Sequence, residues 1–239
     1  MSRTLTNRPI SERQSRKLVP RICSALESAY GKREPVAGQG DPLDELILAA
    51  LSEGSAAKDA QHAFKELNKT FVDWNEVRVS RPGEIEQEID SLEEAGAKAR
   101  RIVRMLNSLF LIRGTLSLSF LLDVGPKEAR DFLAELDGVG DELAARVMLF
   151  SLGYPAVAIT PHVARVTQRV GLVSEESPVE EARKRLEKII PREMMFAFHG
   201  LISDHARRAC LATKPKCSRC VIKRHCKTGK LFKSRRARA

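Results

Sequence analysis

Apolar residues recur at helical spacing along most of the chain. The pattern predicts nine helical segments, at 41–54, 55–71, 83–94, 95–114, 125–136, 141–153, 160–173, 177–190 and 191–210. Within each segment the apolar residues follow one another at intervals of three and four, which places them on one face of an α-helix. We therefore expect about nine or ten helices.

Residues at the segment ends agree with helix boundaries. Asp41 is a predicted N-cap, Pro42 suits a first turn, and Gly54 is a predicted stop. Segment 83–94 places three apolar residues on one face, namely Ile85, Ile89 and Leu92. No run alternates apolar and polar residues for long enough to predict a strand. The predicted fold class is all-α.

Composition narrows the class of protein. The chain has 239 residues, of which 43% are hydrophobic and 30% charged, as expected of a globular protein. A net charge of +10 favours a polyanionic partner, nucleic acid first and an anionic membrane surface second. No apolar run approaches the length of a membrane span, and residues 1–17, a predicted basic arm, lack the apolar stretch of a secretory signal. We expect a cytoplasmic location, associated with the nucleoid if the source is bacterial.

The C-terminal segment 227–239 is strongly basic. It carries six Lys or Arg residues and no Asp or Glu. One interpretation is a solvated, disordered tail. The other is an arm that contacts DNA phosphates, since a disordered basic segment still releases counterions when it binds DNA. Both interpretations stay open.

Four of the five cysteines lie close together near the C-terminus. They are Cys210, Cys217, Cys220 and Cys226, separated by six, two and five residues. The chain's odd total of five cysteines and the clustering of four of them argue against a disulfide framework. Four clustered thiolates suit an iron–sulfur cluster or zinc, although zinc sites usually use two C-x2-C pairs and the chain has one. Cys23 is interpreted as a buried core thiol.

A glycine-containing turn separates the predicted helices 125–136 and 141–153. Gly138 and Gly140 tolerate positive φ, and backbone N–H groups at the following helix start are suited to hold a phosphate oxygen. The alternative is a tight loop with no ligand.

The hairpin and the cysteine spacing together resemble the endonuclease III superfamily of DNA glycosylases. The similarity extends through "ELILAALS", "AGAKARRI", "LGYPAVAITPHVARVTQRVGLV" and "HARRACLATKPKCSRC". It implies a two-lobed helix-hairpin-helix fold, with a six-helix barrel over residues 41–153 and a cluster lobe formed by 18–40 and 154–226. It also implies a [4Fe-4S] cluster held by the four clustered cysteines. The implied partner is double-stranded DNA that is damaged or structurally distorted, and the protein is expected to be a monomer.

The resemblance also predicts where DNA phosphates are contacted. The hairpin residues are Gly138, Val139 and Gly140. The other predicted contacts are His162, Arg165, Lys214, Lys216, Arg219, Lys223 and Arg224, together with Lys227 directly after the last cysteine. A solvated basic face remains the alternative for the cluster loop, which we define as residues 210–226. The other two histidines considered, His199 and His205, are interpreted as packing or phosphate-contact residues.

The sequence departs from the family at its two chemical positions. Glu142 stands where the family's lysine forms a Schiff base, and Thr160 stands where its aspartate supports the reacting sugar. A carboxylate cannot form an imine, and a neutral hydroxyl cannot stabilise a cationic sugar. Thr160 instead suits an N-cap. Gly54 replaces the glutamine that fills the gap left by a flipped base.

Three functional hypotheses follow. The first is a DNA-binding protein, derived from base-excision glycosylases, that does not use their usual chemistry. The second is an active glycosylase with a rearranged site that uses the hairpin carboxylates Asp137, Asp141 and Glu142. The third is an iron–sulfur redox or interaction protein. Whether the protein is an enzyme is left open by the sequence.

Overall fold

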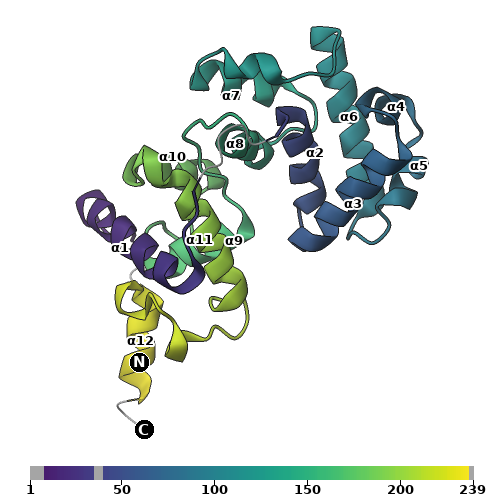
Figure 1. Cartoon of the computed structure of the whole chain (residues 1–239). Helices are drawn as coiled ribbons and strands as arrows, with labels where there is room; N and C mark the ends of the chain where they lie inside the picture. The colour runs from purple at the N-terminus through teal and green to yellow at the C-terminus, as the bar shows by residue number, and fades with distance from the viewer. Residues whose placement is uncertain (1–7, 35–39, 237–239) are drawn as a thin grey trace. The chain divides into compact units, whose positions relative to one another are not determined.

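The structure, a computed structural model, describes residues 8–34 and 40–236. In this part of the chain every regular element is helical and no strand forms, which confirms the predicted all-α class. Figure 1 shows the helices with their labels. Residues 1–7 of the predicted arm, 35–39 of the predicted cluster lobe and 237–239 of the predicted tail lie outside the described residues.

The chain divides into two compact units. The first, called the terminal unit, contains residues 1–36 and 155–239, and the second, called the central unit, contains residues 37–154. Each unit has its own buried apolar core. No described helix is long and apolar enough to cross a membrane.

Two helices, α2 and α6, make most of the helix–helix contacts in the central unit. Helix α2 packs against α3, α6 and α8, while α4 and α5 pack against α6. The bounds are α2 Pro42–Ser52, α3 Ala57–Thr70, α4 Trp74–Val79, α5 Pro82–Glu88, α6 Ala95–Arg113, α7 Pro126–Glu135 and α8 Asp141–Phe150. A short 3-10 turn covers Ser119–Leu122. The carboxylate of Asp41 accepts from the Leu43 N–H at 2.7 Å, which confirms the predicted N-cap of α2.

Two parts of the central unit differ from the sequence prediction. Segment 83–94 is not one helix, because α5 ends at Glu88 and Glu94 adopts a left-handed φ of +57° before α6. Ile89 and Leu92 are nevertheless buried. The spacing of these apolar residues therefore indicated that they are buried, but not that the helix continues, because residues in a turn can be buried as well. The six-residue helix α4 was not anticipated, because so short a segment shows little periodicity.

The terminal unit combines helices from both ends of the chain. Helix α11 packs against α9 and α1, α10 packs against α1, and α12 packs against α9. The bounds are α1 Glu12–Tyr30, α9 Pro161–Val170, α10 Val179–Ile189, α11 Met195–Arg208 and α12 Lys227–Arg236, with 3-10 turns at Arg192–Met194, Cys217–Arg219 and Lys223–His225. Cys23 has 0% exposure in the core of this unit, as predicted.

Both predicted terminal segments need correction. Ser11 caps α1, so this helix starts at Glu12 and the predicted arm boundary at residue 18 falls inside it. The predicted disordered tail is wrong for residues 227–236, which form α12. Packing supplies the reason, since the Thr228 hydroxyl donates to the Arg169 carbonyl at 3.1 Å and α12 lies against α9.

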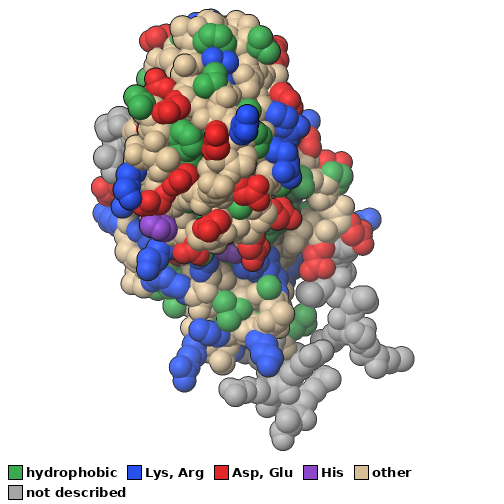
Figure 2. Space-filling view, turned by 90° about the vertical axis from the view of Figure 1, so that its right-hand side faces the viewer, with side chains coloured by type: hydrophobic (Ala, Val, Ile, Leu, Met, Phe, Trp, Pro, Cys, Tyr) green, Lys and Arg blue, Asp and Glu red, His purple; other side chains and the backbone are tan. Residues whose placement is uncertain are grey.

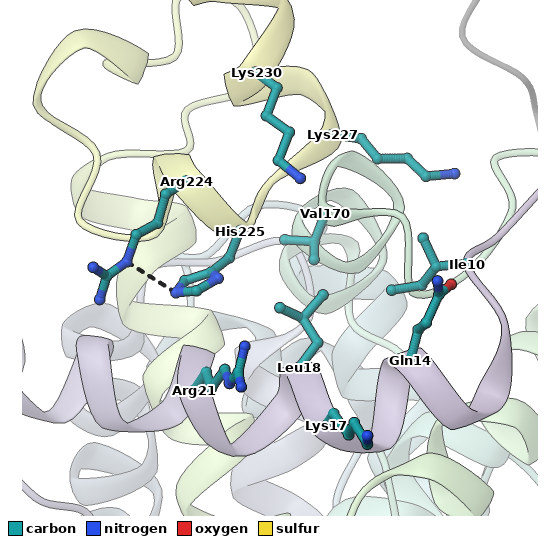
Figure 3. Close-up of a pocket in the computed structure, with 10 residues that line it drawn as sticks. All are labelled: Ile10, Gln14, Lys17, Leu18, Arg21, Val170, Arg224, His225, Lys227 and Lys230. Carbon is teal, nitrogen blue, oxygen red and sulfur yellow. Dashed lines mark hydrogen bonds between the residues drawn. The ribbon is translucent and has the colours of Figure 1, made fainter.

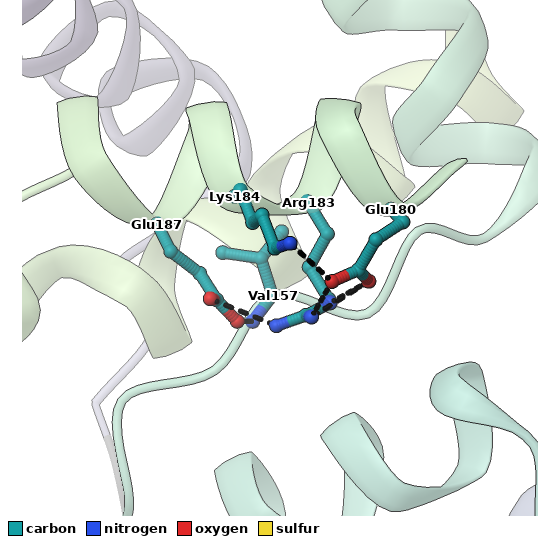
Figure 4. A network of polar contacts seen from close by, with 5 residues as sticks. All are labelled: Val157, Glu180, Arg183, Lys184 and Glu187. Atoms are coloured by element: carbon teal, nitrogen blue, oxygen red, sulfur yellow. Dashed lines mark hydrogen bonds and ion pairs between the residues drawn. The ribbon is translucent and has the colours of Figure 1, made fainter. Parts of the chain in front are cut away.

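A buried arginine organises helix α10. Arg183, only 8% exposed, donates to Glu180 at 2.6 Å and to Glu187 at 3.0 Å, one turn away on either side (Figure 4). Glu187 also accepts from the Val157 N–H at 3.4 Å. Paired acceptors on both sides satisfy the buried guanidinium, so the network fixes the segment before α9 on α10.

Candidate nucleic-acid interface

The predicted hairpin forms between α7 and α8. Gly138 has φ +84°, in the left-handed region, whereas Gly140 has φ −87°. Only Gly138 therefore uses the conformational freedom expected of both glycines. A Cβ at Gly138 would lie 3.1 Å from Met105 Cγ and 3.3 Å from Arg101 Cγ, so the loop approaches α6 closely.

Hydrogen bonds fix the hairpin loop on α6. Arg101 Nε donates to the Gly138 carbonyl at 2.6 Å, and the Asp137 N–H donates to Ser108 Oγ at 3.0 Å. Val139 is 7% exposed and serves as an apolar anchor. Gly140 is the N-cap of α8 and offers no side-chain acceptor to the first-turn N–H groups. Such an N-terminus suits an anion.

Two arginines that the sequence analysis missed lie beside this turn. Arg101 and Arg104 line a shallow hollow of about 520 Å³ together with the three predicted hairpin residues. Arg101 also forms an ion pair with Glu53, and Arg104 lies 3.8 Å from the Asp137 carboxylate. Neither arginine is near the hairpin in sequence, so only the tertiary fold reveals them. The hollow combines cations with a helix N-terminus, as a phosphate site requires.

Glu142 is half-buried in the first turn of α8. Burial raises the pKa of its carboxyl group to about 7, and the Glu53 carboxylate adds to the rise, while Arg146 and Arg101 oppose it. Asp141 is exposed. A carboxyl group that titrates near neutral pH is able both to donate and to accept a proton at that pH.

Thr160 caps helix α9 in the terminal unit. Its hydroxyl oxygen accepts from the Val163 N–H at 3.2 Å, which confirms the predicted N-cap. His162 is half-buried, and burial together with Arg165 and Arg207 lowers its pKa. Arg165 donates to the Cys210 carbonyl at 2.9 Å, so it braces the start of the cluster loop. DNA contact by His162 and Arg165 stays a prediction.

The four clustered cysteines line a single cavity in the terminal unit. Cys210 follows α11, Cys217 and Cys220 flank a 3-10 turn, and Cys226 precedes α12. None of the five cysteines, Cys23 included, takes part in a disulfide. Burial raises the thiol pKa of Cys217 and Cys226, and it raises the thiol pKa of Cys220 to about 11.

Several groups around this cavity donate toward sulfur. Arg169 lies 3.4 Å from Cys210 Sγ and also holds the Leu211 carbonyl at 2.7 Å. The Gly229 N–H donates to Cys226 Sγ at 3.4 Å. His205 contacts Cys220 Sγ through Nε2 at 3.5 Å and Tyr30 Oη through Nδ1 at 3.0 Å. The fold thus reveals the contact of Arg169, which lies 41 positions before Cys210, and places the buried His205 against Cys220.

The donor set fits a group with four thiolate ligands. Within residues 8–34 and 40–236, no three His, Cys, Asp or Glu side chains form a site for a single metal ion. Four thiols nevertheless face one cavity, and N–H donors reach two of the sulfurs. Hydrogen bonds to cysteine sulfur are the contacts by which a protein tunes an iron–sulfur group.

The basic residues of the cluster loop are mostly accessible. Lys214, Lys216, Arg219 and Arg224 are exposed, and Lys223 is half-buried. Figure 2 shows that basic and acidic side chains are interspersed over much of one face, with Lys and Arg prominent toward the bottom of the view. Because the two signs are mixed on that face, an anion would be attracted there by local groups of Lys and Arg.

Comparisons with known proteins agree with this architecture. No protein-family model matches the chain. Endonuclease III of Bacillus subtilis (strain 168) is 31% identical over 192 residues, which cover 79% of this chain and 82% of that protein. Endonuclease III of Sulfolobus acidocaldarius is 28% identical over 182 residues, covering 76% and 80% respectively.

Solved structures agree as well. A non-covalent endonuclease III–DNA complex has a TM-score of 0.77 and 26% identity, covering 94% of this chain and 99% of that chain. A thermostable thymine-DNA glycosylase shares the fold with a TM-score of 0.70 at 21% identity, covering 92% and 98%. These similarities confirm the resemblance predicted from the hairpin and the cysteines. The chain belongs to the endonuclease III-like superfamily of DNA-repair glycosylases.

Proposed function

We propose that the protein binds damaged or distorted double-stranded DNA without the lysine and aspartate chemistry of its superfamily. The observation that carries this proposal is the pair of residues at the two chemical positions. Glu142 offers no amine, and the Thr160 hydroxyl is engaged in capping α9. Neither residue is able to form an imine or to stabilise a cationic sugar by charge.

Two features support contact with DNA phosphates. In the central unit, the uncapped N-terminus of α8 lies beside Arg101 and Arg104. In the terminal unit, the cluster loop exposes Lys214, Lys216 and Arg219. Contacts of this type position a protein on a duplex and carry no sequence information. Relatives in the solved structures are endonuclease III–DNA complexes.

The four clustered cysteines would hold a [4Fe-4S] cluster. Cys210, Cys217, Cys220 and Cys226 face the same cavity, and Arg169 and Gly229 supply N–H groups to two of their sulfurs. When bound, the group supplies a four-thiolate crosslink and a redox-active centre. Arg169 and Arg165 hold the carbonyl groups at the start of the loop, so α9 sets where the basic residues lie.

A second candidate function has its own supporting observation. Glu142 has a pKa near 7, next to the Glu53 carboxylate. A carboxyl group poised at neutral pH is suited to general acid–base chemistry, so an active glycosylase with a rearranged site around α8 is the alternative. In this alternative Glu142 exchanges the proton and Arg101 and Arg146 limit the rise of its pKa.

The deciding experiment measures binding and base release on the same protein. Anaerobically purified protein is titrated against an intact duplex and against duplexes with oxidised, deaminated, alkylated or abasic sites. Each duplex is then assayed for released base and borohydride-trapped imine. We expect tighter binding to damaged than to intact duplex, with neither product. Binding at equal affinity to all duplexes would contradict damage recognition.

Variants distinguish the two candidates. If the wild type releases base, Glu142→Gln should abolish release while the exposed neighbour variant Asp141→Asn retains it, and the second candidate then holds. If the wild type is silent, a Glu142→Lys plus Thr160→Asp double variant tests whether the ancestral chemistry returns. Imine trapping by the double variant alone would locate the loss of activity at those two positions.

A further inference from the structure

A basic groove lies in the terminal unit along helix α1. Its opposite wall is formed by the 3-10 turn Lys223–His225 and the first turn of α12 (Figure 3). The groove has a volume of about 400 Å³. Its apolar lining consists of Ile10, Leu18 and Val170, and its cations are Lys17, Arg21, Arg224, Lys227 and Lys230. Arg224 and Lys227 are also predicted DNA contacts, but those contacts leave the α1 side of the groove, with Lys17 and Arg21, unexplained.

The walls of the groove are held in place by backbone contacts. The Ile10 N–H donates to the Gly171 carbonyl at 2.9 Å, which ties the start of the chain to the end of α9. Lys227 Nζ donates to the Arg8 carbonyl at 2.6 Å. The Lys227 stem lies over Gly171, where an added Cβ would come within 2.5 Å of Lys227 Cδ. The groove is therefore a formed feature and needs no rearrangement to accept a ligand.

The cations of the groove lack acidic partners. None of the five forms an ion pair with any residue that the structure describes, and the lining contains no Asp or Glu. Glu12, at the start of the same helix, is paired with Lys188 at 2.9 Å. Five like charges around one hollow repel one another and attract an anionic ligand.

The groove continues along α1 into a second hollow. This hollow, about 690 Å³, shares Arg21, Arg224 and His225 with the first and adds Pro20, Ser24, Ala25 and Ser28. The two hollows together follow α1 from its start to Ser28, a length of about 25 Å at the helical rise. This length would accommodate about eight residues of an extended peptide.

We propose that this groove docks an acidic segment of a partner protein, one that carries aliphatic side chains between its Asp or Glu residues. The carboxylates meet the five cations, and the aliphatic side chains cover Ile10, Leu18 and Val170. Single-stranded nucleic acid fits less well, because its bases need aromatic side chains to stack on and the lining has none besides His225. The chain's own segments 1–7, 35–39 and 237–239 contain no Asp or Glu, so none of them matches the acidic segment proposed here.

The test uses the full-length protein and a fluorescent twelve-residue peptide of alternating Glu and Leu. Anisotropy is compared with a Glu–Ser peptide of equal charge and with oligo-dT. We expect the Glu–Leu peptide to bind at least tenfold more tightly than either competitor. The variant K17E/R21E should weaken its binding at least tenfold. The matched variant R13E/R16E changes the charge of α1 equally but outside the groove lining, and should alter binding less than twofold.

Four outcomes would overturn the proposal. Equal losses in both variants would mean diffuse attraction to a basic protein. Equal binding of the Glu–Ser peptide would mean that the apolar residues have no role. If oligo-dT bound more tightly than the Glu–Leu peptide and K17E/R21E abolished that binding, the groove would be assigned to nucleic acid. A concentration-dependent dimer, seen by sedimentation and lost in K17E/R21E, would assign it to a second copy of the chain.

Discussion

The burial of one residue, Glu142, makes the stability of the fold depend on pH. Its pKa rises from 4.5 to about 7 in the fold, because burial and Glu53 disfavour the carboxylate. Below about pH 4.5 the group is protonated in both folded and unfolded chains and has no effect. As pH rises toward 7, the unfolded chain loses its proton first, so this group progressively destabilises the fold. Above pH 7 the penalty is complete.

We therefore predict that Glu142→Gln stabilises the protein at pH 8 and not at pH 4. The expected gain in the free energy of unfolding is about 1–2 kcal/mol, reduced by the partial exposure of the group. Urea denaturation at both pH values measures it, with Asp141→Asn as the exposed control in the same turn. An equal gain at pH 4 would show that charge is not the cause.

The candidate residues were predictable from sequence to very different degrees. The four clustered cysteines could be found because their spacing is local, and Thr160 because an N-cap needs only its own helix. Arg101 and Arg169 could not. Arg101 reaches Gly138 across 37 positions and Arg169 reaches Cys210 across 41, and such contacts exist only once helices pack.

At the scale of elements, the C-terminal end of α2 depends on one buried cation. Lys98, 7% exposed, donates to the carbonyls of Leu51 and Glu53 at 3.1 and 2.6 Å and to Ser55 Oγ at 2.7 Å. These carbonyls have no partner further along the helix, which ends at Ser52. The lysine therefore acts as the cap of α2.

Replacing Lys98 by Met keeps the aliphatic stem and removes the three donors. We predict a loss of about 2–4 kcal/mol in the free energy of unfolding, since buried acceptors would lose their hydrogen bonds. Lys65→Met, at an exposed position on α3, is the control and should change stability by less than about 0.5 kcal/mol. Chemical denaturation compares the two. Similar small effects would mean that water replaces the ammonium group.

The hairpin turn gives a second prediction at this scale. Gly138→Ala forces an alanine into φ +84° and brings its Cβ against Met105 and Arg101, so we expect a loss of more than about 1–2 kcal/mol in stability. Gly153→Ala meets the same backbone penalty at φ +67° with no atom within 4 Å. Both variants should lower the unfolding free energy, and only Gly138→Ala should also weaken DNA binding. Equal DNA affinity of the two would separate the hairpin from DNA contact.

Element boundaries were predictable where a cap marks them. Asp41 and Gly114 mark the start of α2 and the end of α6, and both ends lie where the sequence indicates. Helix α1 was missed, since Pro20 interrupts its pattern, and the length of α5 was overestimated, since its apolar spacing continues into a turn. Helix α12 forms from a segment that was interpreted as a disordered tail or an arm, because its packing partners are α9 and the turn Lys223–His225.

At the scale of the whole molecule, a net charge of +10 does not distinguish one basic surface from another. Two clusters of cations lie in the terminal unit. One is the exposed part of the cluster loop, with Lys214 and Lys216, and the other is the groove along α1, with Lys17 and Arg21. If the first binds DNA phosphates and the second binds an acidic peptide, the two activities should be separable by mutation.

The salt dependence of DNA binding tests this separation. Each lost phosphate contact reduces the slope of log K against log salt concentration by about 1, so Lys214→Ala plus Lys216→Ala should reduce it by about 2. Lys17→Ala plus Arg21→Ala removes the same charge and should leave the slope unchanged. Anisotropy titrations at several salt concentrations measure both. Only specific phosphate contacts make the slope depend on which cations are removed. An equal reduction of the slope by the two double variants would therefore mean that net charge alone attracts the DNA.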